Sequence, residues 1–154
     1  MGDVQTTVIA ISRCPLALAI ADHNNTLIQC CCHINDDIIC IAVAVKEENY
    51  CQSETFRPRC LAGETVVISK AIYGRMSDTG RCLQDEEELP ALKDDPKYMN
   101  CFEDVFYLVS AKCSGKLGCE IRIPDPKMER TNPCYKHMAK YLAVAYYCVK
   151  GMIS

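Results

Sequence analysis

Residues 140–148 carry the sequence KYLAVAYYC, and this stretch decides the fold. Its apolar side chains alternate from one face to the other, which is the pattern of a β-strand. One face of that strand holds Leu142, Val144, Tyr146 and Cys148. An inward-facing cysteine at the end of the strand favours a disulfide that closes a long loop, which would stabilise a domain with a modest core.

Cysteine sets this composition apart. The chain has 154 residues and 13 cysteines, a density that indicates a disulfide framework or a metal cluster and is unusual for a reducing cytosol. Since 13 is odd, at least one thiol cannot be paired within the chain. Eight cysteines after residue 50 form an even set without a C-x-x-C pair, so disulfides are favoured over zinc there. The eight are Cys51, Cys60, Cys82, Cys101, Cys113, Cys119, Cys134 and Cys148.

The remaining composition is that of a globular protein. Hydrophobic residues make up 49% and charged residues 24% of the chain, and the formal net charge is −3. Nucleic acid is not expected as a partner, because phosphate binding needs a clustered excess of lysine and arginine. No membrane span is expected, because no run of about 18 apolar residues is free of charge.

The chain divides near residue 50. Residues 1–50 hold two basic and six acidic side chains, whereas ten of the eleven aromatic residues follow residue 50. Because large rings supply much of the buried area of a core, we expect the principal core in the second segment. The sequence therefore predicts an apolar, cysteine-rich extension over residues 1–49 and a domain over residues 50–150.

Two interpretations fit the extension. Short apolar runs separated by polar groups predict added strands of the domain's sheet. Alternatively, residues 1–21 are a cleaved secretion signal, in which Ala19 and Ala21 form a small-x-small cleavage site, although Arg13 interrupts the apolar run. Asn24 fits the pattern of a glycan acceptor and is a candidate glycosylation residue.

The extension also carries a cluster of cysteines. Adjacent residues in a strand face opposite sides, so three consecutive cysteines and His33 do not converge easily on one zinc ion. One or two further disulfides are therefore favoured, with one thiol left over that can bridge to another chain. The five cysteines concerned are Cys14, Cys30, Cys31, Cys32 and Cys40.

Three further elements are predicted in the second segment. Residues 66–73 form a strand buried on both sides, with Ile72 on the face of Val66 and Tyr73 on the other. Residues 102–112 have apolar side chains at helical spacing, and Gly115 follows as a stop. The acidic residues 85–88 lie in a loop without EF-hand spacing, so we expect a solvated surface there.

No motif indicates catalysis. The three histidines, His23, His33 and His137, have no recognisable catalytic motif around them. Phosphate-binding glycine loops, H-E-x-x-H and G-x-S-x-G are all absent from the sequence. We therefore expect neither an enzyme nor a cofactor.

The spacing of the eight cysteines encloses several familiar motifs. They are AIYGR at residues 71–75, CSGKLGC at 113–119, NPC at 132–134 and KYLAVAYYC at 140–148. In this order they resemble the sea-urchin-egg-lectin domain, or L-rhamnose-binding lectin domain. The resemblance covers about residues 50–149 and leaves residues 1–45 unexplained.

The resemblance implies a fold and a disulfide pairing. The fold is mostly β (α+β), with two small antiparallel sheets and one α-helix, closed by about four disulfides. Carried onto this sequence, the family pairing joins Cys51 to Cys82, Cys60 to Cys148, Cys101 to Cys134, and Cys113 to Cys119.

The resemblance also implies a sugar site of the L-rhamnose or D-galactose type that needs no metal. The matching positions are Gln52, Tyr73, Arg75, Asn132 and Lys140. Such a site supplies acceptors and donors for a vicinal diol and an aromatic edge for the apolar sugar face.

Three features depart from the family pattern. Gln52 stands where the family has Glu, and Asn132 where it has Asp, so two charge-assisted hydrogen bonds become neutral ones of about half the strength. Residues 135–139 form a loop one residue longer than usual, without the glycine that lets backbone approach a ligand.

The sequence therefore predicts an extracellular, non-enzymatic, carbohydrate-binding module with a weakened sugar site. The alternative is a structural or adhesion subunit that uses the lectin fold for protein–protein assembly, with the extension docking on a neighbour in a homo- or hetero-oligomer. Tyr73 would then serve core packing and Arg75 would be a buried hydrogen-bond donor.

Overall fold

The computed structural model describes residues 16–22, 25–34, 37–76, 80–84 and 90–150. Several sequence predictions fall outside these residues: residues 1–15 of the alternative secretion signal, the cysteine Cys14, His23, the glycosylation candidate Asn24, and the acidic loop at residues 85–88.

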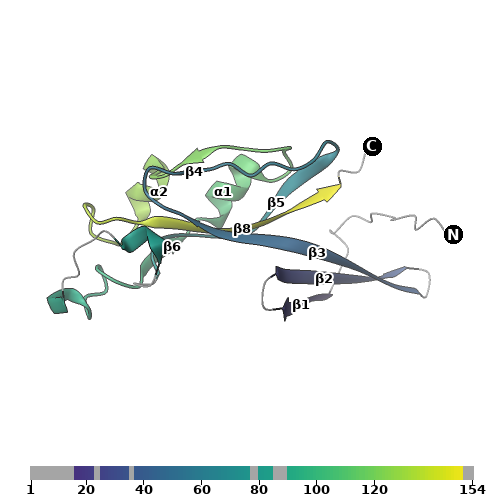
Figure 1. Cartoon of the computed structure of the whole chain (residues 1–154), viewed down its shortest axis with the longest axis horizontal. Coiled ribbons are helices and arrows are strands. Elements are labelled where there is room, and N and C mark those ends of the chain that lie inside the picture. The colour runs from purple at the N-terminus through teal and green to yellow at the C-terminus, as the bar shows by residue number, and fades with distance from the viewer. Residues whose placement is uncertain (1–15, 23–24, 35–36, 77–79, 85–89, 151–154) are drawn as a thin grey trace.

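Six antiparallel strands form the main sheet, in the order β1-β2-β3-β8-β5-β6 (Figure 1). Their bounds are β1 Leu16–Asp22, β2 Asn25–Ile34, β3 Asp37–Tyr50, β5 Glu64–Arg75, β6 Cys101–Asp104 and β8 Tyr141–Lys150. The strand predicted from residues 140–148 is β8, which lies between β3 and β5. It is buried on both faces near its middle, where Val144 and Ala145 are 1% and 4% exposed.

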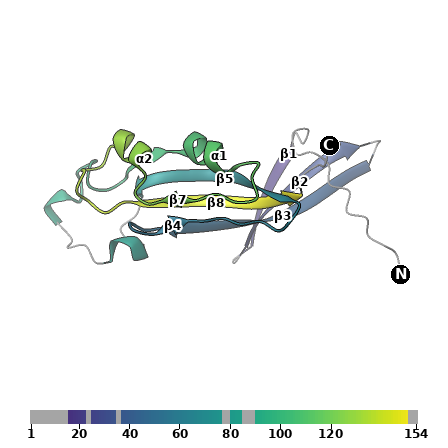
Figure 2. The same cartoon turned by 90° about the horizontal axis from the view of Figure 1, so that it is seen from above.

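The second sheet and the helices complete the domain. Strands β4 (Thr55–Phe56) and β7 (Ile121–Arg122) form a two-stranded ribbon. The helix α1 (Phe106–Cys113) and the shorter helix α2 (Pro126–Thr131) lie on the same side of the main sheet (Figures 1 and 2). Two 3-10 turns span Arg81–Leu83 and Pro90–Leu92. No helix among the described residues is long and apolar enough to cross a membrane.

The predicted fold class is confirmed. The chain is mostly β, with two antiparallel sheets, one main helix and four disulfides in the described part. These disulfides join Cys51 to Cys82, Cys60 to Cys148, Cys101 to Cys134, and Cys113 to Cys119, which are the pairs that the resemblance implies.

The extension continues the sheet of the domain. Strand β3 pairs with β2 over residues 37–45 and then with β8 over residues 46–50. The predicted division between residues 49 and 50 therefore falls within a single strand. From residue 16 onward the described part of the extension forms added strands.

A bulge in β5 decides which side chains face the core. The register with β8 shifts between Ile68 and Lys70. Downstream of the shift, Ala71 and Tyr73 are buried with Ile68, while Ile72 is only partly buried. The predicted grouping of Ile72 with the earlier core residues is therefore wrong, because one extra residue exchanges the two faces of a strand.

The predicted helix over residues 102–112 begins too early. Residues up to Asp104 belong to β6, and α1 starts only at Phe106, whose N–H donates to the Asp104 Oδ1 at 2.8 Å. The cause lies across the sheet: Phe102 pairs with Gly74, and only a glycine leaves room for this approach. Register with β5 therefore overrides the helical spacing.

The core joins both sheets to the helices. Val109 of α1, Met128 of α2, Phe56 of the ribbon and Leu142 of β8 are all fully buried in one cluster. Such a core is small, and the Cys60–Cys148 disulfide, with a sequence separation of 88 residues, adds about 4–5 kcal/mol in the chain-entropy account.

Gly74 offers a direct test of the β5–β6 register. Its φ is +147°, and a Cβ would lie 2.2 Å from the carbonyl oxygen of Cys101. We expect Gly74→Ala to lower the free energy of unfolding by about 3 kcal/mol or more, measured by urea titration of the oxidised protein.

Gly80→Ala is the matched control for that substitution. Its φ is −96°, and the nearest atom to an added Cβ is 3.9 Å away. We expect Gly80→Ala to change stability by less than about 0.5 kcal/mol. Equal effects of the two substitutions would contradict the assigned register.

Candidate functional site

Four of the five predicted site residues come together at one end of the main sheet. Tyr73 and Arg75 end β5, Asn132 caps the C-terminus of α2, and Lys140 immediately precedes β8. The Asn132 Nδ2 donates to the backbone oxygen of Tyr73 at 2.9 Å, which fixes α2 against β5.

Lys140 is a buried cation at the centre of this group. Its side chain is 3% exposed, and its ammonium lies 3.1 Å from the Glu129 Oε2. It also donates to the backbone oxygen of Lys136 at 3.3 Å. Because a buried ammonium without a counter-charge is costly, the Glu129 carboxylate is what permits this burial.

The Tyr73 side chain meets the same carboxylate. Its ring is buried, and its hydroxyl donates to the Glu129 Oε1. Burial, followed by the hydrogen bond and the negative charge of Glu129, raises the pKa of Tyr73 well above its usual value. Tyr73 is therefore a protonated donor throughout the physiological pH range.

Glu129 is the site residue that sequence reasoning missed. Its carboxylate accepts from Tyr73 through one oxygen and from Lys140 through the other, and its side chain is 31% exposed. A carboxylate has about four lone-pair positions, so Glu129 can accept further hydrogen bonds. The available signal was Asp125-Pro126, which marks the start of a short helix that carries Glu129.

Asp125 holds α2 in place. Its Oδ1 accepts from the N–H groups of Lys127 at 2.8 Å and Met128 at 3.4 Å, and its Oδ2 lies 2.8 Å from the Lys112 Nζ. Burial opposes ionisation, but the bonds from Lys112 and Lys127 outweigh it and hold the pKa of Asp125 below its usual value. This anchor sets the position of Glu129, one turn further on.

Arg75 ties the neighbouring loop to the sheet. It is 2% exposed and donates from Nη1 to the backbone oxygen of Ala139 at 3.0 Å. Its guanidinium also lies 5.0 Å from the centre of the Tyr98 ring. These contacts make Arg75 a positioning residue for the loop that leads into Lys140.

Asn132 is engaged at both ends of its amide. Besides donating to Tyr73, it accepts from the N–H of Cys134 at 2.9 Å through Oδ1. Cys134 in turn forms a disulfide with Cys101, the first residue of β6. An aspartate at residue 132 would keep the bond from Cys134 and lose the one to Tyr73.

Gln52 stands apart from this cluster in its contacts. It is exposed in the loop between β3 and β4, and no hydrogen bond joins it to the other four predicted residues among those the structure describes. The adjacent backbone is firmly placed, because the Ser53 N–H donates to the oxygen of Ile123 at 2.9 Å.

The longer loop at residues 135–139 packs against residues 95–98. The Tyr135 hydroxyl donates to the Asp95 Oδ2 at 2.6 Å, and its N–H donates to the oxygen of Lys97 at 3.1 Å. His137 is exposed on this loop. The loop is therefore held against residues 95–98, and Lys140 follows it into the core.

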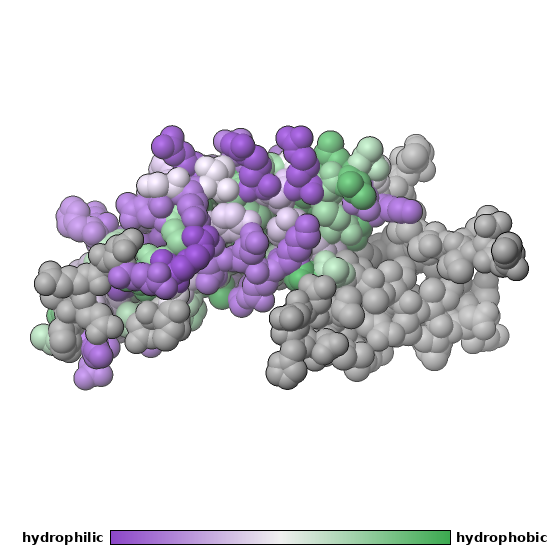
Figure 3. All heavy atoms as spheres, viewed as in Figure 1, coloured by the Kyte–Doolittle hydropathy of each residue, from purple (hydrophilic) through white to green (hydrophobic). Residues whose placement is uncertain are grey.

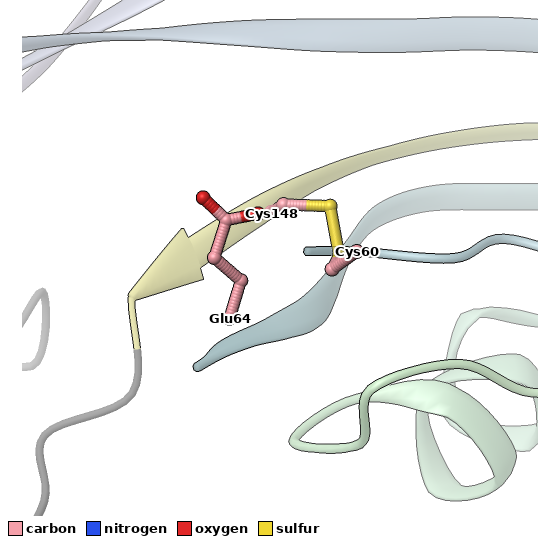
Figure 4. A group of neighbouring side chains, drawn as sticks. All are labelled: Cys60, Glu64 and Cys148. Atoms are coloured by element: carbon pink, nitrogen blue, oxygen red, sulfur yellow. A yellow bond between two sulfur atoms is a disulfide. The ribbon is translucent and has the colours of Figure 1, made fainter. Parts of the chain in front are cut away.

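One group of potential metal ligands lies elsewhere, at the far end of β8. Figure 4 shows Cys60, Glu64 and Cys148 side by side, with their ligand atoms within 4.8 Å of one another. Both sulfurs form the Cys60–Cys148 disulfide, so neither is a thiolate that could bind a metal ion. Glu64 instead accepts from the N–H of Leu61 at 3.1 Å.

Together, the two antiparallel sheets, the main helix and the four disulfides define a lectin-like module. The chain belongs to the D-galactoside/L-rhamnose binding SUEL lectin domain family, whose sequence model matches residues 58–148. The resemblance inferred from the motifs is thus confirmed, and the chain carries a carbohydrate-binding, lectin-like module.

A curated relative is protein eva-1 homolog C of Pan troglodytes. It is 26% identical to this chain over 107 residues, which cover 68% of this chain and 22% of the relative. The chain therefore spans about a fifth of that protein's length.

The Asp125 anchor predicts a dependence of stability on acid. Because the folded-state pKa of Asp125 is lowered, its contribution to stability is complete above the unfolded value of about 3.9 and is lost as pH falls through the folded value. We expect Asp125→Asn, which keeps a capping acceptor, to flatten the fall of unfolding free energy below about pH 4.

The control for the acid measurement is Asp94→Asn, which alters an exposed side chain. Its unfolding free energy should follow that of the unsubstituted protein over the same pH range. An Asp125→Asn profile parallel to both would show that the Lys112–Asp125 pair contributes nothing to the folded state.

Proposed function

We propose that the domain binds a sugar of the L-rhamnose or D-galactose type at the cluster of Tyr73, Glu129, Asn132 and Lys140. The observation that carries the proposal is the Glu129 carboxylate, whose side chain is 31% exposed. It is held between a tyrosine hydroxyl and a buried ammonium, and a carboxylate can accept more than these two hydrogen bonds.

Glu129 supplies one negative charge in place of the two that the family pattern has at other positions. Gln52 and Asn132 are neutral at positions where the family has carboxylates, and Asn132 is occupied by backbone groups. A carboxylate from α2 restores one charge-assisted acceptor for a vicinal diol. Lys140 donates to Glu129 and to the backbone oxygen of Lys136, so its buried ammonium holds the carboxylate in place.

The binding is proposed to be reversible, non-enzymatic and independent of a bound metal. Its chemistry consists of hydrogen bonds to hydroxyl groups, and the cluster offers no pair of groups arranged as nucleophile and base. Four disulfides are consistent with an extracellular or cell-surface location, where such bonds persist. The partner is then a glycan of the cell surface or of secreted material.

Calorimetric titration with L-rhamnose and D-galactose tests the proposal. We expect saturable binding that survives a chelator and that falls about tenfold or more in Glu129→Gln, because a charge-assisted bond becomes neutral. Glu47→Gln is the control, since Glu47 is half-exposed on β3 and pairs with Lys70 at 3.0 Å. Absence of binding at millimolar sugar would refute the proposal.

The departure at residue 52 gives a gain-of-function test. Gln52 is exposed, and no hydrogen bond joins it to the described residues of the cluster. Gln52→Glu should therefore fold normally and raise sugar affinity a few-fold if the loop lines the site. Asn132→Asp should not help, because it removes the bond to Tyr73. Heteronuclear NMR titration of both variants with sugar measures the two affinities. A gain in affinity in Asn132→Asp alone would mean that the folded domain does not need the bond from the Asn132 amide to Tyr73.

A second candidate function is protein–protein assembly through the extension. It is favoured by one observation: β1 forms the end of the six-stranded sheet, and an edge strand is a template for pairing with another chain. Light scattering of the oxidised chain tests it, and electrophoresis in denaturant without reductant separates the two kinds of assembly. An assembly maintained by an intermolecular disulfide survives denaturant, and one maintained by strand pairing does not. A monomer in light scattering would exclude self-assembly.

A further inference from the structure

The β4–β7 ribbon presents a row of arginines on its outer face. Phe56 pairs with Ile121, and both are buried in the core. The neighbouring pair, Thr55 with Arg122, therefore lies on the opposite face, because successive residues of a strand alternate. Arg122 is exposed there.

The same alternation continues beyond the ribbon. The Arg57 Nη2 lies 3.1 Å from the Glu120 Oε1, and the two side chains are 60% and 61% exposed. Two residues further along, Arg59 forms an isolated bridge with Gly118 and is also exposed. Arg122, Arg57 and Arg59 thus follow one another along a single outward face.

A groove runs beside this row. It encloses about 600 Å³, and its lining includes Arg57, Arg59, Leu117, Gly118 and Glu120. A Cβ on Gly118 would lie 2.8 Å from the oxygen of Pro58, so the close approach of the two segments requires glycine. The strand position opposite Arg59 therefore has no side chain.

The chemistry of the groove is cationic with one apolar wall. No ion pair with a described residue neutralises Arg59 or Arg122, and Glu120 is the acid that contacts Arg57. Leu117 is 52% exposed in the lining. Figure 3 shows hydrophilic side chains along the side of the molecule that bears the helices, next to a hydrophobic patch.

We propose that this groove binds an extended acidic peptide, in which carboxylates alternate with apolar side chains. Arg57 and Arg59 are two residues apart in the segment that follows β4, where exposed and buried residues alternate and Arg59 bridges to Gly118. In extended backbone such residues are about 6.6–6.8 Å apart, which is also the repeat of side chains on one face of an extended peptide. Each guanidinium can take a carboxylate with two parallel hydrogen bonds.

Leu117 selects a peptide over an acidic polysaccharide. An exposed leucine in a groove gains free energy when apolar surface covers it. A peptide can supply an aliphatic side chain at that point, whereas a sulfated sugar chain supplies hydroxyl and sulfate groups. Cationic and apolar contacts in one groove therefore fit an acidic peptide with leucine-like residues.

The groove is separate from the proposed sugar site. Its residues come from the segment that follows β4 and from the segment between α1 and β7, whereas the proposed sugar site uses β5, α2 and the residue before β8 (Figure 1). Peptide binding therefore goes beyond the proposed function and does not depend on it. Saturating L-rhamnose should leave peptide affinity unchanged.

Fluorescence anisotropy with a labelled Asp-Leu-Asp-Leu-Asp peptide tests the proposal on the intact oxidised chain. We expect saturable binding that weakens as salt rises from about 50 to 500 mM, because the contacts are between exposed charges. Arg59→Ala should weaken it about tenfold. The control Lys93→Ala, which removes an exposed charge next to the Pro90–Leu92 turn, should have no effect.

Glu120→Gln supplies a test that a loss of folding cannot imitate. It removes the acid that competes for Arg57, so acidic peptide should bind a few-fold more tightly. Leu117→Asn should weaken the peptide and leave a sulfated dextran probe unaffected. The proposal is overturned if the peptide does not bind, if Glu120→Gln does not strengthen binding, or if sulfated dextran binds more tightly and Leu117 makes no difference to the peptide.

Discussion

The disulfide between Cys60 and Cys148 is the constraint on which the rest of the structure depends. It joins the segment after the β4–β7 ribbon to β8, the strand that lies between β3 and β5. Lys140 immediately precedes β8 and Cys148 lies near the other end of this strand, so β8 connects the proposed sugar site to the groove end of the molecule. A domain of about 100 residues has a limited core, and cross-links of this kind supply much of what the core lacks.

The sequence was most informative where its signals are local or covalent. The alternation over residues 140–148 predicted β8, and the order of the cysteines with their intervening motifs indicated the family. It was least informative where register across the sheet decides the outcome. The bulge after Ile68 moved Tyr73 to the core face, and the approach of Phe102 to Gly74 replaced the first turn of a predicted helix by β6. Neither effect has a signature within a single strand, because both depend on which residues lie opposite.

The same limit applies to the candidate site. Four of its residues could be found because they stand inside motifs, and the structure brings these four together. Glu129 could not be found in this way, since it lies in a six-residue helix whose position depends on the Asp125 cap and the Lys112 contact. The neutral residues at positions 52 and 132 suggested a depleted site. In three dimensions the negative charge is present, but it comes from a helix instead of a loop.

Strand β3 has a mechanical consequence. It is one uninterrupted strand that belongs to the hairpin of the extension at one end and to the sheet of the domain at the other. A pull on the extension, along the axis of β3, would load its five pairings with β8 in shear, so that the hydrogen bonds resist together instead of opening one by one. The Cys51–Cys82 bond follows immediately after the last of these pairings and would stop the strand from sliding out. Force applied to the extension would thus be transmitted to the lectin-like domain without first unfolding the strand that joins them.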